Sequence, residues 1–225
     1  MKKKVVVFTG AGMSAESGIQ TFRDGNGLWN NFRIEEVATL LAWHTNPSLV
    51  LEFYNGRRKN ILDAKPNEAH FEIAKLEDAF DINVITQNID DLHERAGSSN
   101  VLHLHGEIFK MRSEADSSLV YPIRNDMQLG DRAEDGEQLR PHIVWFGEEV
   151  PLMEPAIQIT MQAEVFIVIG SSLVVYPAAS LLNYVPSHVQ VIVIDKRLPE
   201  IGSRQVTYIE EAATEGVTKL RRMLL

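Results

Sequence analysis

KKKVVVFTGAGMSAESGIQTFRDGNGLW, residues 2–29, is the stretch that decides the fold. Residues 5–8 form an apolar, β-branched run, which is typical of a parallel strand covered on both faces. Gly10 and Gly12 follow, and because glycine has no Cβ the backbone can turn sharply there and approach a ligand closely. Small residues and an acid then open a predicted helix, whose first N–H groups and dipole favour an anion. We predict a phosphate cradle for a pyrophosphate, with a ligand-free strand-to-helix turn as the alternative.

The glycine turn departs from the usual dinucleotide-binding fingerprint. That fingerprint places an acid at a strand end about 20 residues after the glycines, where it holds the ribose hydroxyls. No such acid stands there in this sequence. Other segments are therefore expected to hold the ribose.

Predicted strands and helices alternate along the chain. The expected strands are residues 5–9, 83–86, 101–103, 143–145, 165–169 and 189–194, and the expected helices are residues 48–63, 67–79 and 155–163, with Asn67 as a possible helix cap. This order predicts an α/β fold, a doubly wound, Rossmann-like parallel sheet, with its ligand crevice at the carboxyl ends of the strands. Gly10, Gln87, His105 and Gly170 all follow strands, so we expect them to converge.

Length and composition limit the classes of protein. The 225 residues fit one domain, with a small polar insert at about residues 110–140 and a helical segment at about residues 30–80. The formal net charge of −9 argues against nucleic acid or an anionic membrane as partner. No apolar run reaches the roughly 20 residues that span a bilayer, and no signal-peptide pattern opens the chain, so we expect a cytoplasmic protein. The absence of cysteine excludes disulfides and thiol catalysis.

Five motifs occur together and in a fixed order: GAGMSAESGIQTFR, TQNIDDLHERAG, LHGE, RPHIVWFGE and GSSLVVYPAA. In this the chain resembles the sirtuin family of NAD-dependent protein lysine deacylases, from residue 5 to about residue 217. The resemblance implies one catalytic domain, NAD as co-substrate and acylated-lysine proteins or peptides as substrates. The sequence leaves the oligomeric state open, with a monomer as one possibility.

The implied reaction removes an acyl group from lysine. Nicotinamide leaves NAD, the acyl oxygen attacks C1′ of the ribose, and the 2′-hydroxyl then attacks the resulting imidate, which yields O-acyl-ADP-ribose. The resemblance makes His105 the base and places Asn88 at the same ribose, and an ordinary histidine pKa of about 6.5 suits this role. A histidine that only satisfies a core hydrogen bond is the alternative. His103 shares the strand face of His105 and is expected to be structural.

The resemblance also implies the cofactor contacts. Gln87 and Asn88 meet the nicotinamide ribose, Asp90 accepts from the carboxamide, and Asp91 faces outward, whereas an ordinary turn or cap is the alternative for this stretch. The implied cofactor-binding residues are Gly10, Ala11, Gly12, Ser14, Ala15, Phe22, Arg23, Gln87, Asn88, Asp90, Gly170, Ser171, Ser172, Asp195 and Ala213.

Two of these assignments have a definite alternative. Phe22 and Arg23 resemble a mobile segment that closes over the cofactor, and the glycine-rich residues 24–27 suit a lid that excludes water. A solvent loop with one core aromatic is the alternative. Asp195 stands where an adenosine-ribose contact is expected, and a strand-ending cap is its alternative.

The substrate peptide is expected to add as a strand between the segment after residues 146–148 and residues 173–176. Val144 and Phe146 are expected to line the acyl-lysine tunnel, with core packing as the alternative, especially for Val144. Gly147 is a further expected substrate-binding residue.

The acyl group itself is predicted from the helix at residues 48–63. Tyr54 and Arg57 lie three residues apart and share a face, and together they match the Tyr-x-x-Arg signature of sirtuins that favour succinyl- and malonyl-lysine. Ala38 matches a small residue that makes room in the same pocket. Arg58 and Lys59 are expected to be solvated, and an exposed helix face is the alternative for the whole pair. We expect removal of succinyl and malonyl groups, with weaker deacetylation.

The insert departs from the family. Most sirtuins hold a structural zinc there with two C-x-x-C pairs, and alignment puts these positions near Ser113, Asp116, Arg132 and Asp135. None supplies a thiolate, so we predict no zinc, with an Arg132 pairing to Asp116 or Asp135 instead.

Two further function classes remain open. A module that senses NAD or ADP-ribose without turnover is disfavoured by intact His105 and Asn88. An ADP-ribosyltransferase or NAD hydrolase would use the same site and the same cleavage step.

Overall fold

The computed structural model describes residues 2–21, 28–29, 32–199, 201–202 and 204–225. Its centre is a six-stranded sheet in the order β11-β10-β9-β1-β4-β5, in which every pairing is parallel. The strands are β1 (Lys4–Thr9), β4 (Asp81–Thr86), β5 (Val101–His103), β9 (Val165–Ile169), β10 (Gln190–Ile194) and β11 (Val206–Ile209). The predicted doubly wound α/β fold is confirmed.

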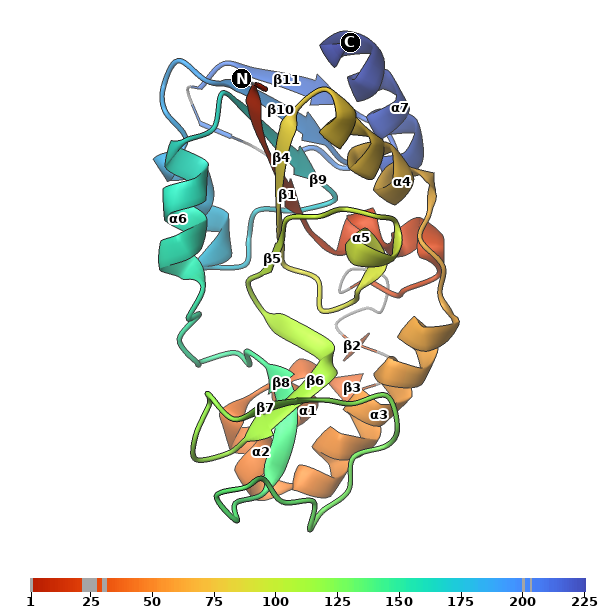
Figure 1. The fold of residues 1–225 in the computed structure, drawn as a ribbon, viewed down its shortest axis with the longest axis vertical. Coiled ribbons are helices and arrows are strands. Elements are labelled where there is room, and N and C mark those ends of the chain that lie inside the picture. The colour runs from red at the N-terminus through yellow and green to blue at the C-terminus, as the bar shows by residue number, and fades with distance from the viewer. Residues whose placement is uncertain (1, 22–27, 30–31, 200, 203) are drawn as a thin grey trace.

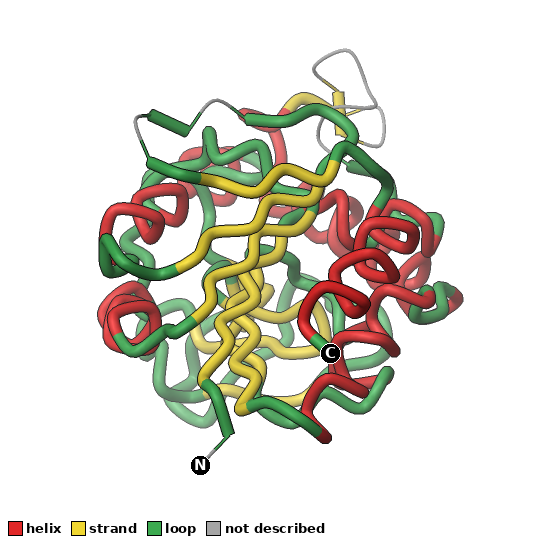
Figure 2. The backbone as a smooth tube through the Cα atoms, turned by 90° about the horizontal axis from the view of Figure 1, so that it is seen from above, coloured by secondary structure: helices red, strands yellow, loops and turns green. Residues whose placement is uncertain are grey.

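Helices cover both faces of this sheet (Figure 2). Along β1, Val5 and Val7 pack toward one face and Val6 and Phe8 toward the other, so the strand is buried on both sides. Helices α4 (Glu68–Lys75) and α7 (Ala213–Leu224) contribute to the first face. Helix α6 (Met153–Met161) and the 3₁₀ helix η4 (Ala178–Tyr184) contribute to the second.

A smaller lobe stands beyond the carboxyl ends of the strands (Figure 1). It combines an antiparallel sheet of order β7-β6-β8 with the helices that precede it in sequence, around their own apolar core. Its elements are β6 (Gly106–Ser113), β7 (Val120–Pro122), β8 (Leu139–Ile143), β3 (Phe32–Arg33), paired with β2 (Leu28–Trp29), α1 (Ile34–Val37), α2 (Leu40–Thr45) and α3 (Pro47–Asp63). The lobe therefore joins the helical segment and the insert that the sequence had separated.

Several predicted elements differ from the observed ones. The strand expected at residues 143–145 is wrong: β8 ends at Ile143 and belongs to the small antiparallel sheet, because the chain turns at Trp145 to Glu148. The helix expected at residues 67–79 is α4 followed by the 3₁₀ helix η3 (Leu76–Asp78), and Asn67 caps α4 as predicted by accepting from Ala69 N at 3.0 Å. β11 and the short helix α5 (Leu92–Arg95) were not predicted. Among the described residues, no helix is long and apolar enough to cross a membrane.

Candidate active site

The carboxyl ends of neighbouring strands meet at one level of the parallel sheet. Thr9, the last residue of β1, pairs with Thr86 and with Ile169, and Thr86 pairs with His103. Residues that follow β1, β4, β9 and β5 therefore lie side by side. This register places the sequence motifs at a common edge.

Hydrogen bonds join the segments that follow these strands. Gln87 Nε2 donates to Ser171 Oγ at 2.8 Å, and Asn88 Nδ2 donates to the Gly10 carbonyl at 3.0 Å. His105 Nδ1 lies 3.1 Å from the Gln87 carbonyl oxygen. The predicted convergence of these motifs at one edge of the sheet is confirmed.

The two glycine turns pack directly against each other. A Cβ on Gly10 would lie 2.7 Å from the Gly170 carbonyl oxygen, and one on Gly12 would lie 2.6 Å from Gly170 Cα. The glycines are therefore needed for backbone-to-backbone packing, in addition to any ligand. The helix predicted after Gly12 is only two short 3₁₀ helices, η1 (Ala11–Met13) and η2 (Ala15–Ser17). The expected helix-dipole contribution is correspondingly small.

A buried chain of polar side chains runs from the first glycine turn to the segment after β4. Asn88 Nδ2 donates to Ser14 Oγ at 3.1 Å, and Ser14 Oγ donates to Asp90 Oδ2 at 3.0 Å. Asp90 also accepts from Leu92 N at 3.2 Å. Burial raises the pKa of Asp90, and these hydrogen bonds oppose the rise. The three side chains form a pre-positioned wall of amide, hydroxyl and carboxyl groups.

His105 has one ring nitrogen held by the backbone. The Gln87 carbonyl can only accept, so Nδ1 carries the proton and Nε2 keeps its lone pair. Burial lowers the pKa of His105, and the bond to Gln87 partly offsets this. A half-buried histidine with a free Nε2 lone pair is suited to accept a proton from a substrate near neutral pH.

The other predicted cofactor residues stand after strands, at the start of α7 or outside the described residues. Phe22, Arg23 and the glycine-rich residues 24–27 fall outside the described residues. Asp195 follows β10 and accepts from Arg197 N at 2.9 Å, as a strand-ending cap would, and its expected adenosine-ribose contact stays a prediction. Ser172 lies in the loop after β9, and Ala213 is buried at the start of α7.

Sequence reasoning missed a clamp between η2 and α7. Glu16 accepts from Thr214 N at 3.0 Å and from Thr214 Oγ1 at 2.7 Å. The clamp fixes the first glycine turn against the C-terminal helix. No local pattern identifies it, because the partners stand 198 residues apart.

Tyr54 and Arg57 are buried on α3, so the exposed-face alternative for them is wrong. Their exposed fractions are 1% and 6%. Burial lowers the pKa of Arg57 to about 10, and the nearby Tyr54 and Asp90 oppose the shift. Ala38 is also buried and its carbonyl accepts from Phe146 N at 2.9 Å. We call Ala38, Tyr54 and Arg57 the predicted acyl pocket.

The segment expected to line the substrate tunnel lies next to this pocket. Val144 N donates to the His105 carbonyl at 3.0 Å, and Val144 is half-buried. Phe146 is 45% exposed, which is inconsistent with plain core packing. Gly147 has a φ of +88°, and Glu148 N closes the turn on the Trp145 carbonyl at 3.0 Å.

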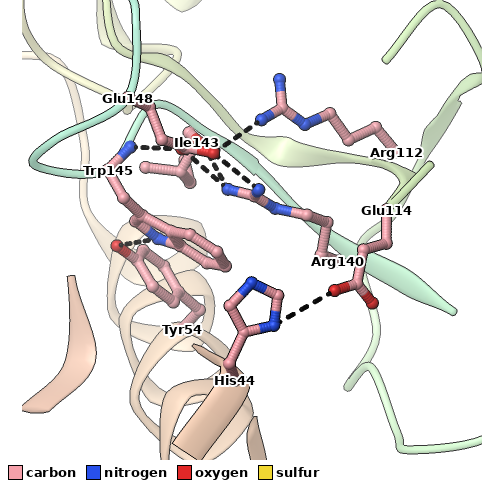
Figure 3. A network of polar contacts seen from close by, with 8 residues as sticks. All are labelled: His44, Tyr54, Arg112, Glu114, Arg140, Ile143, Trp145 and Glu148. Atoms are coloured by element: carbon pink, nitrogen blue, oxygen red, sulfur yellow. Dashed lines mark hydrogen bonds and ion pairs between the residues drawn. The ribbon is translucent and has the colours of Figure 1, made fainter. Parts of the chain in front are cut away.

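A polar network supports this turn from behind (Figure 3). Arg140 donates to both carboxylate oxygens of Glu148 at 2.7 and 2.9 Å, and its guanidinium lies 3.5 Å from the centre of the Trp145 ring. Glu148 also accepts from Trp145 N at 2.8 Å, and Trp145 Nε1 donates to Tyr54 Oη at 3.0 Å. Arg112 Nη2 lies 3.5 Å from the same carboxylate. The bracket of Arg140, Glu148 and Trp145 thus reaches the predicted acyl pocket.

Arg58 is not solvated, contrary to the sequence-based expectation. It is 1% exposed and donates from Nε to the Ile108 carbonyl at 3.1 Å and from Nη1 to Asn55 Oδ1 at 2.7 Å. It therefore ties α3 to β6. Lys59 is exposed as expected and pairs with Asp126 at 2.8 Å.

Four positions of this chain align with the zinc-binding cysteines of most sirtuins. Hydrogen bonds connect three of them: Ser113, Asp116 and Asp135. Ser113 is buried, its hydroxyl donates to Asp135 at 2.6 Å, and it accepts from the amides of Ala115 and Asp116 at 3.1 and 3.2 Å. Arg132 donates to the Gly136 carbonyl at 2.5 Å, and the ion pair expected for it with Asp116 or Asp135 is not formed. Within the described ranges, no cluster of three or more His, Cys, Asp or Glu side chains suits a metal ion.

Comparison with known proteins identifies the family of this chain. Residues 10–177 match the Sir2 family. A relative from Bacteroides thetaiotaomicron named NAD-dependent protein deacylase is 49% identical, over 99% of this chain and 98% of the relative. A relative of the same name from Helicobacter pylori is 50% identical, over 99% of this chain and 98% of the relative. The solved structure of a Sir2 homologue with NAD is 38% identical and superposes with a TM-score of 0.88, over 100% of this chain and 91% of its own. The chain therefore belongs to the Sir2 family.

Proposed function

We propose that this protein is an NAD-dependent protein lysine deacylase that prefers succinyl- and malonyl-lysine and also removes acetyl groups. The observation that carries the acyl preference is a buried arginine and tyrosine on α3, close to the polar wall of Ser14, Asn88 and Asp90. Relatives named NAD-dependent protein deacylase support the general activity. We treat residues 1–225 as one catalytic unit.

The polar groups at the strand ends fit NAD. The cradle has no Cβ where Gly10, Gly12 and Gly170 meet, and the Asn88 amide and the Asp90 carboxyl match ribose hydroxyls and a carboxamide. When bound, NAD would supply a ribose carbon that becomes reactive as nicotinamide leaves. This protein would hold the ribose with Asn88 and orient the carboxamide with Asp90.

His105 would be the base. Its Nδ1–H is committed to the Gln87 carbonyl, so Nε2 would take the proton of a ribose hydroxyl. The backbone bond also fixes the plane of the ring, which lowers the entropy cost of reaching the reactive geometry.

The predicted acyl pocket would bind an acidic acyl group through its carboxylate. A guanidinium can hold a carboxylate with two parallel hydrogen bonds, and low water content strengthens them. Because the Tyr54 hydroxyl oxygen accepts from Trp145, its own O–H is directed to another acceptor, for which the acyl carboxylate is suited. A neutral acetyl group gains neither bond, so it would be the weaker substrate.

The peptide would bind as an added strand between the Phe146 turn and the loop after β9. Val174 and Tyr176 are 70% and 71% exposed in that loop, and Phe146 is 45% exposed in its own turn. Main-chain pairing gives affinity with little sequence preference, which suits an enzyme that acts on many proteins.

The test mixes the protein with NAD and matched succinyl-, acetyl- and unmodified lysine peptides. Nicotinamide release and peptide mass are followed together. Loss of the succinyl mass in step with nicotinamide supports the proposal. Nicotinamide release with every peptide unchanged would indicate an NAD hydrolase, and a peptide that gains the ADP-ribose mass would indicate ADP-ribosyl transfer.

The acyl preference has its own pair of variants. Arg57→Met should lose the preference for succinyl-lysine by roughly 10- to 100-fold, the equivalent of hydrogen bonds to a charged group. Lys59→Met, which removes an exposed cation from the same helix, should leave the preference unchanged. An Arg57→Met protein that still prefers succinyl-lysine contradicts the assignment.

A further inference from the structure

Two histidines at the end of β5 hold two consecutive backbone carbonyls of the catalytic segment. His105 Nδ1 lies 3.1 Å from the Gln87 carbonyl oxygen, and His103 Nδ1 lies 3.0 Å from the Asn88 carbonyl oxygen. The rings differ at their second nitrogen. Nε2 of His103 lies 2.7 Å from a carboxylate oxygen of Glu94, on α5.

Both partners of His103 can only accept hydrogen bonds. A carbonyl oxygen has no proton, and neither has an ionised carboxylate, so both ring nitrogens of His103 must donate. Burial raises the pKa of Glu94, but the hydrogen bond and the charge of His103, with smaller contributions from Glu94's own backbone and Lys110, together outweigh burial and lower that pKa. The shared proton is therefore on the His103 ring. His103 is therefore an imidazolium, in contrast to the neutral His105.

The surroundings of His103 favour this charge. Burial lowers the pKa of His103. The hydrogen bond and the charge of Glu94, with support from the Asn88 carbonyl and from Glu107 on β6, raise this pKa by more than burial lowers it. Asp90 and His93 are the other titratable neighbours. The His103 cation stabilises the ionised form of Asp90 and disfavours the protonated form of His93. The net result is a raised pKa, so His103 keeps its proton to a higher pH than an ordinary histidine does.

The Asn88 peptide is fixed from both sides. Asn88 N donates to Thr86 Oγ1 at 3.0 Å and the Asn88 carbonyl accepts from His103, while the side-chain amide reaches Gly10 and Ser14. The position of that amide therefore depends on the His103 bond. Glu94 has a side chain that is 40% exposed, so the pair can exchange its proton with solvent.

We propose that His103 and Glu94 act as a positioning pair that holds the Asn88 carbonyl, sets the Asn88 amide toward the ribose of NAD, and gives the enzyme its alkaline limit. A neutral imidazole has a single N–H, which cannot serve both acceptors. The shorter, charge-assisted bond to Glu94 is the stronger one, so deprotonation releases the Asn88 carbonyl. This inference rests on the proposed function, because it concerns the binding of NAD.

The first measurement is the pH profile of kcat/KM for NAD, from about pH 6 to about pH 10, which spans ordinary and raised histidine pKa values. Wild-type protein should lose activity on the acid side through His105 and on the alkaline side through His103. In Glu94→Gln a neutral His103 can accept from the glutamine amide and still donate to Asn88, so the alkaline fall should disappear while activity at neutral pH stays within about twofold. Glu107→Gln, a nearby acid that makes no hydrogen bond to His103, should retain the alkaline fall.

Two variants at His103 separate positioning from general stability. His103→Ala should lower kcat/KM for NAD about tenfold at every pH, the equivalent of one lost hydrogen bond. His103→Asn restores an N–H donor without a titrating charge, so it should recover part of the activity and show no alkaline fall. A purely structural role would not produce a pH-independent rescue.

The second measurement needs no activity. Nitrogen NMR of the imidazole rings should show His103 protonated on both nitrogens at neutral pH in the wild type and on one in Glu94→Gln. A neutral His103 in the wild type, or an unchanged alkaline fall in Glu94→Gln, overturns this inference alone. A wild-type protein that releases no nicotinamide with any peptide overturns the proposed function and the role in catalysis inferred here with it.

Discussion

Replacement of Gly170 by alanine tests whether the two glycine turns pack as described. Gly170 has a φ of +63°, in the left-handed region that disfavours residues with a Cβ. An added Cβ would lie 2.6 Å from Gly12 Cα and would also meet the backbone of Met13. These are backbone atoms, so no side-chain rotation can relieve the contact.

The expected loss of stability follows from two contributions. The left-handed conformation costs a non-glycine residue roughly 1–2 kcal/mol. Forcing extra volume between tightly packed groups costs about 1–3 kcal/mol more. We expect Gly170→Ala to lower the free energy of unfolding by about 2–5 kcal/mol and to weaken NAD binding, because the turn is displaced from Gly10 and Gly12.

Urea unfolding measures the change, with NAD titration of the folded protein alongside. Gly56→Ala is the matched control, because Gly56 lies inside α3 and a Cβ there meets nothing within 4 Å. That variant should gain about 0.5–1 kcal/mol, since alanine favours the helix over glycine. If Gly170→Ala loses less than about 1 kcal/mol, or binds NAD as tightly as the wild type, the packing of the two turns is not what requires the glycine.

Four further predictions concern the insert, the polar bracket and the helix cap. Ser113→Ala should destabilise the small lobe by about 1–2 kcal/mol in urea unfolding, because Asp135 and two amides lose their partner; an unchanged midpoint would argue against this role of the Ser113 hydroxyl. Metal analysis of purified protein should find no zinc, and one zinc per chain would refute the prediction. Burial raises the pKa of Glu148, but hydrogen bonds from Arg140 and Trp145 N outweigh burial and lower that pKa. The ionised Glu148 therefore stabilises the fold above its unfolded pKa of about 4.3, and this stabilisation is lost as the pH falls through the lower folded pKa. Glu148→Gln should flatten this acid dependence of thermal stability, and an equally steep dependence in the variant would disprove the assignment. Asn67→Ala should lower the free energy of unfolding by about 1–2 kcal/mol in the same urea assay, since the capping bond is lost. It should also raise the KM for NAD, because Asn67 Nδ2 donates to the Met13 carbonyl. Wild-type values of both quantities would contradict these two expectations.

The parallel sheet, the order of the motifs and the convergence of Gly10, Gln87, His105 and Gly170 follow from the sequence by itself. A run such as residues 5–8 records its burial on both faces in its own composition, and parallel strands bring their carboxyl ends to one edge. Asn67 was identified as a cap for the same reason: a cap acts over three or four residues. Such features are local, so the chain encodes them locally.

Only the tertiary structure decided the rest. Four features depend on partners distant in the chain or on register and burial. They are the antiparallel sheet with β8, the buried Arg58, the Trp145 bond to Tyr54, and the opposite protonation of His103 and His105. An arginine on a helix looks the same in sequence whether water or the Ile108 carbonyl meets it, and a histidine on a strand looks the same whether or not a carboxylate lies beside it. Sequence determines which groups are present, whereas their charge and role depend on which acceptors and how much water the fold places around them.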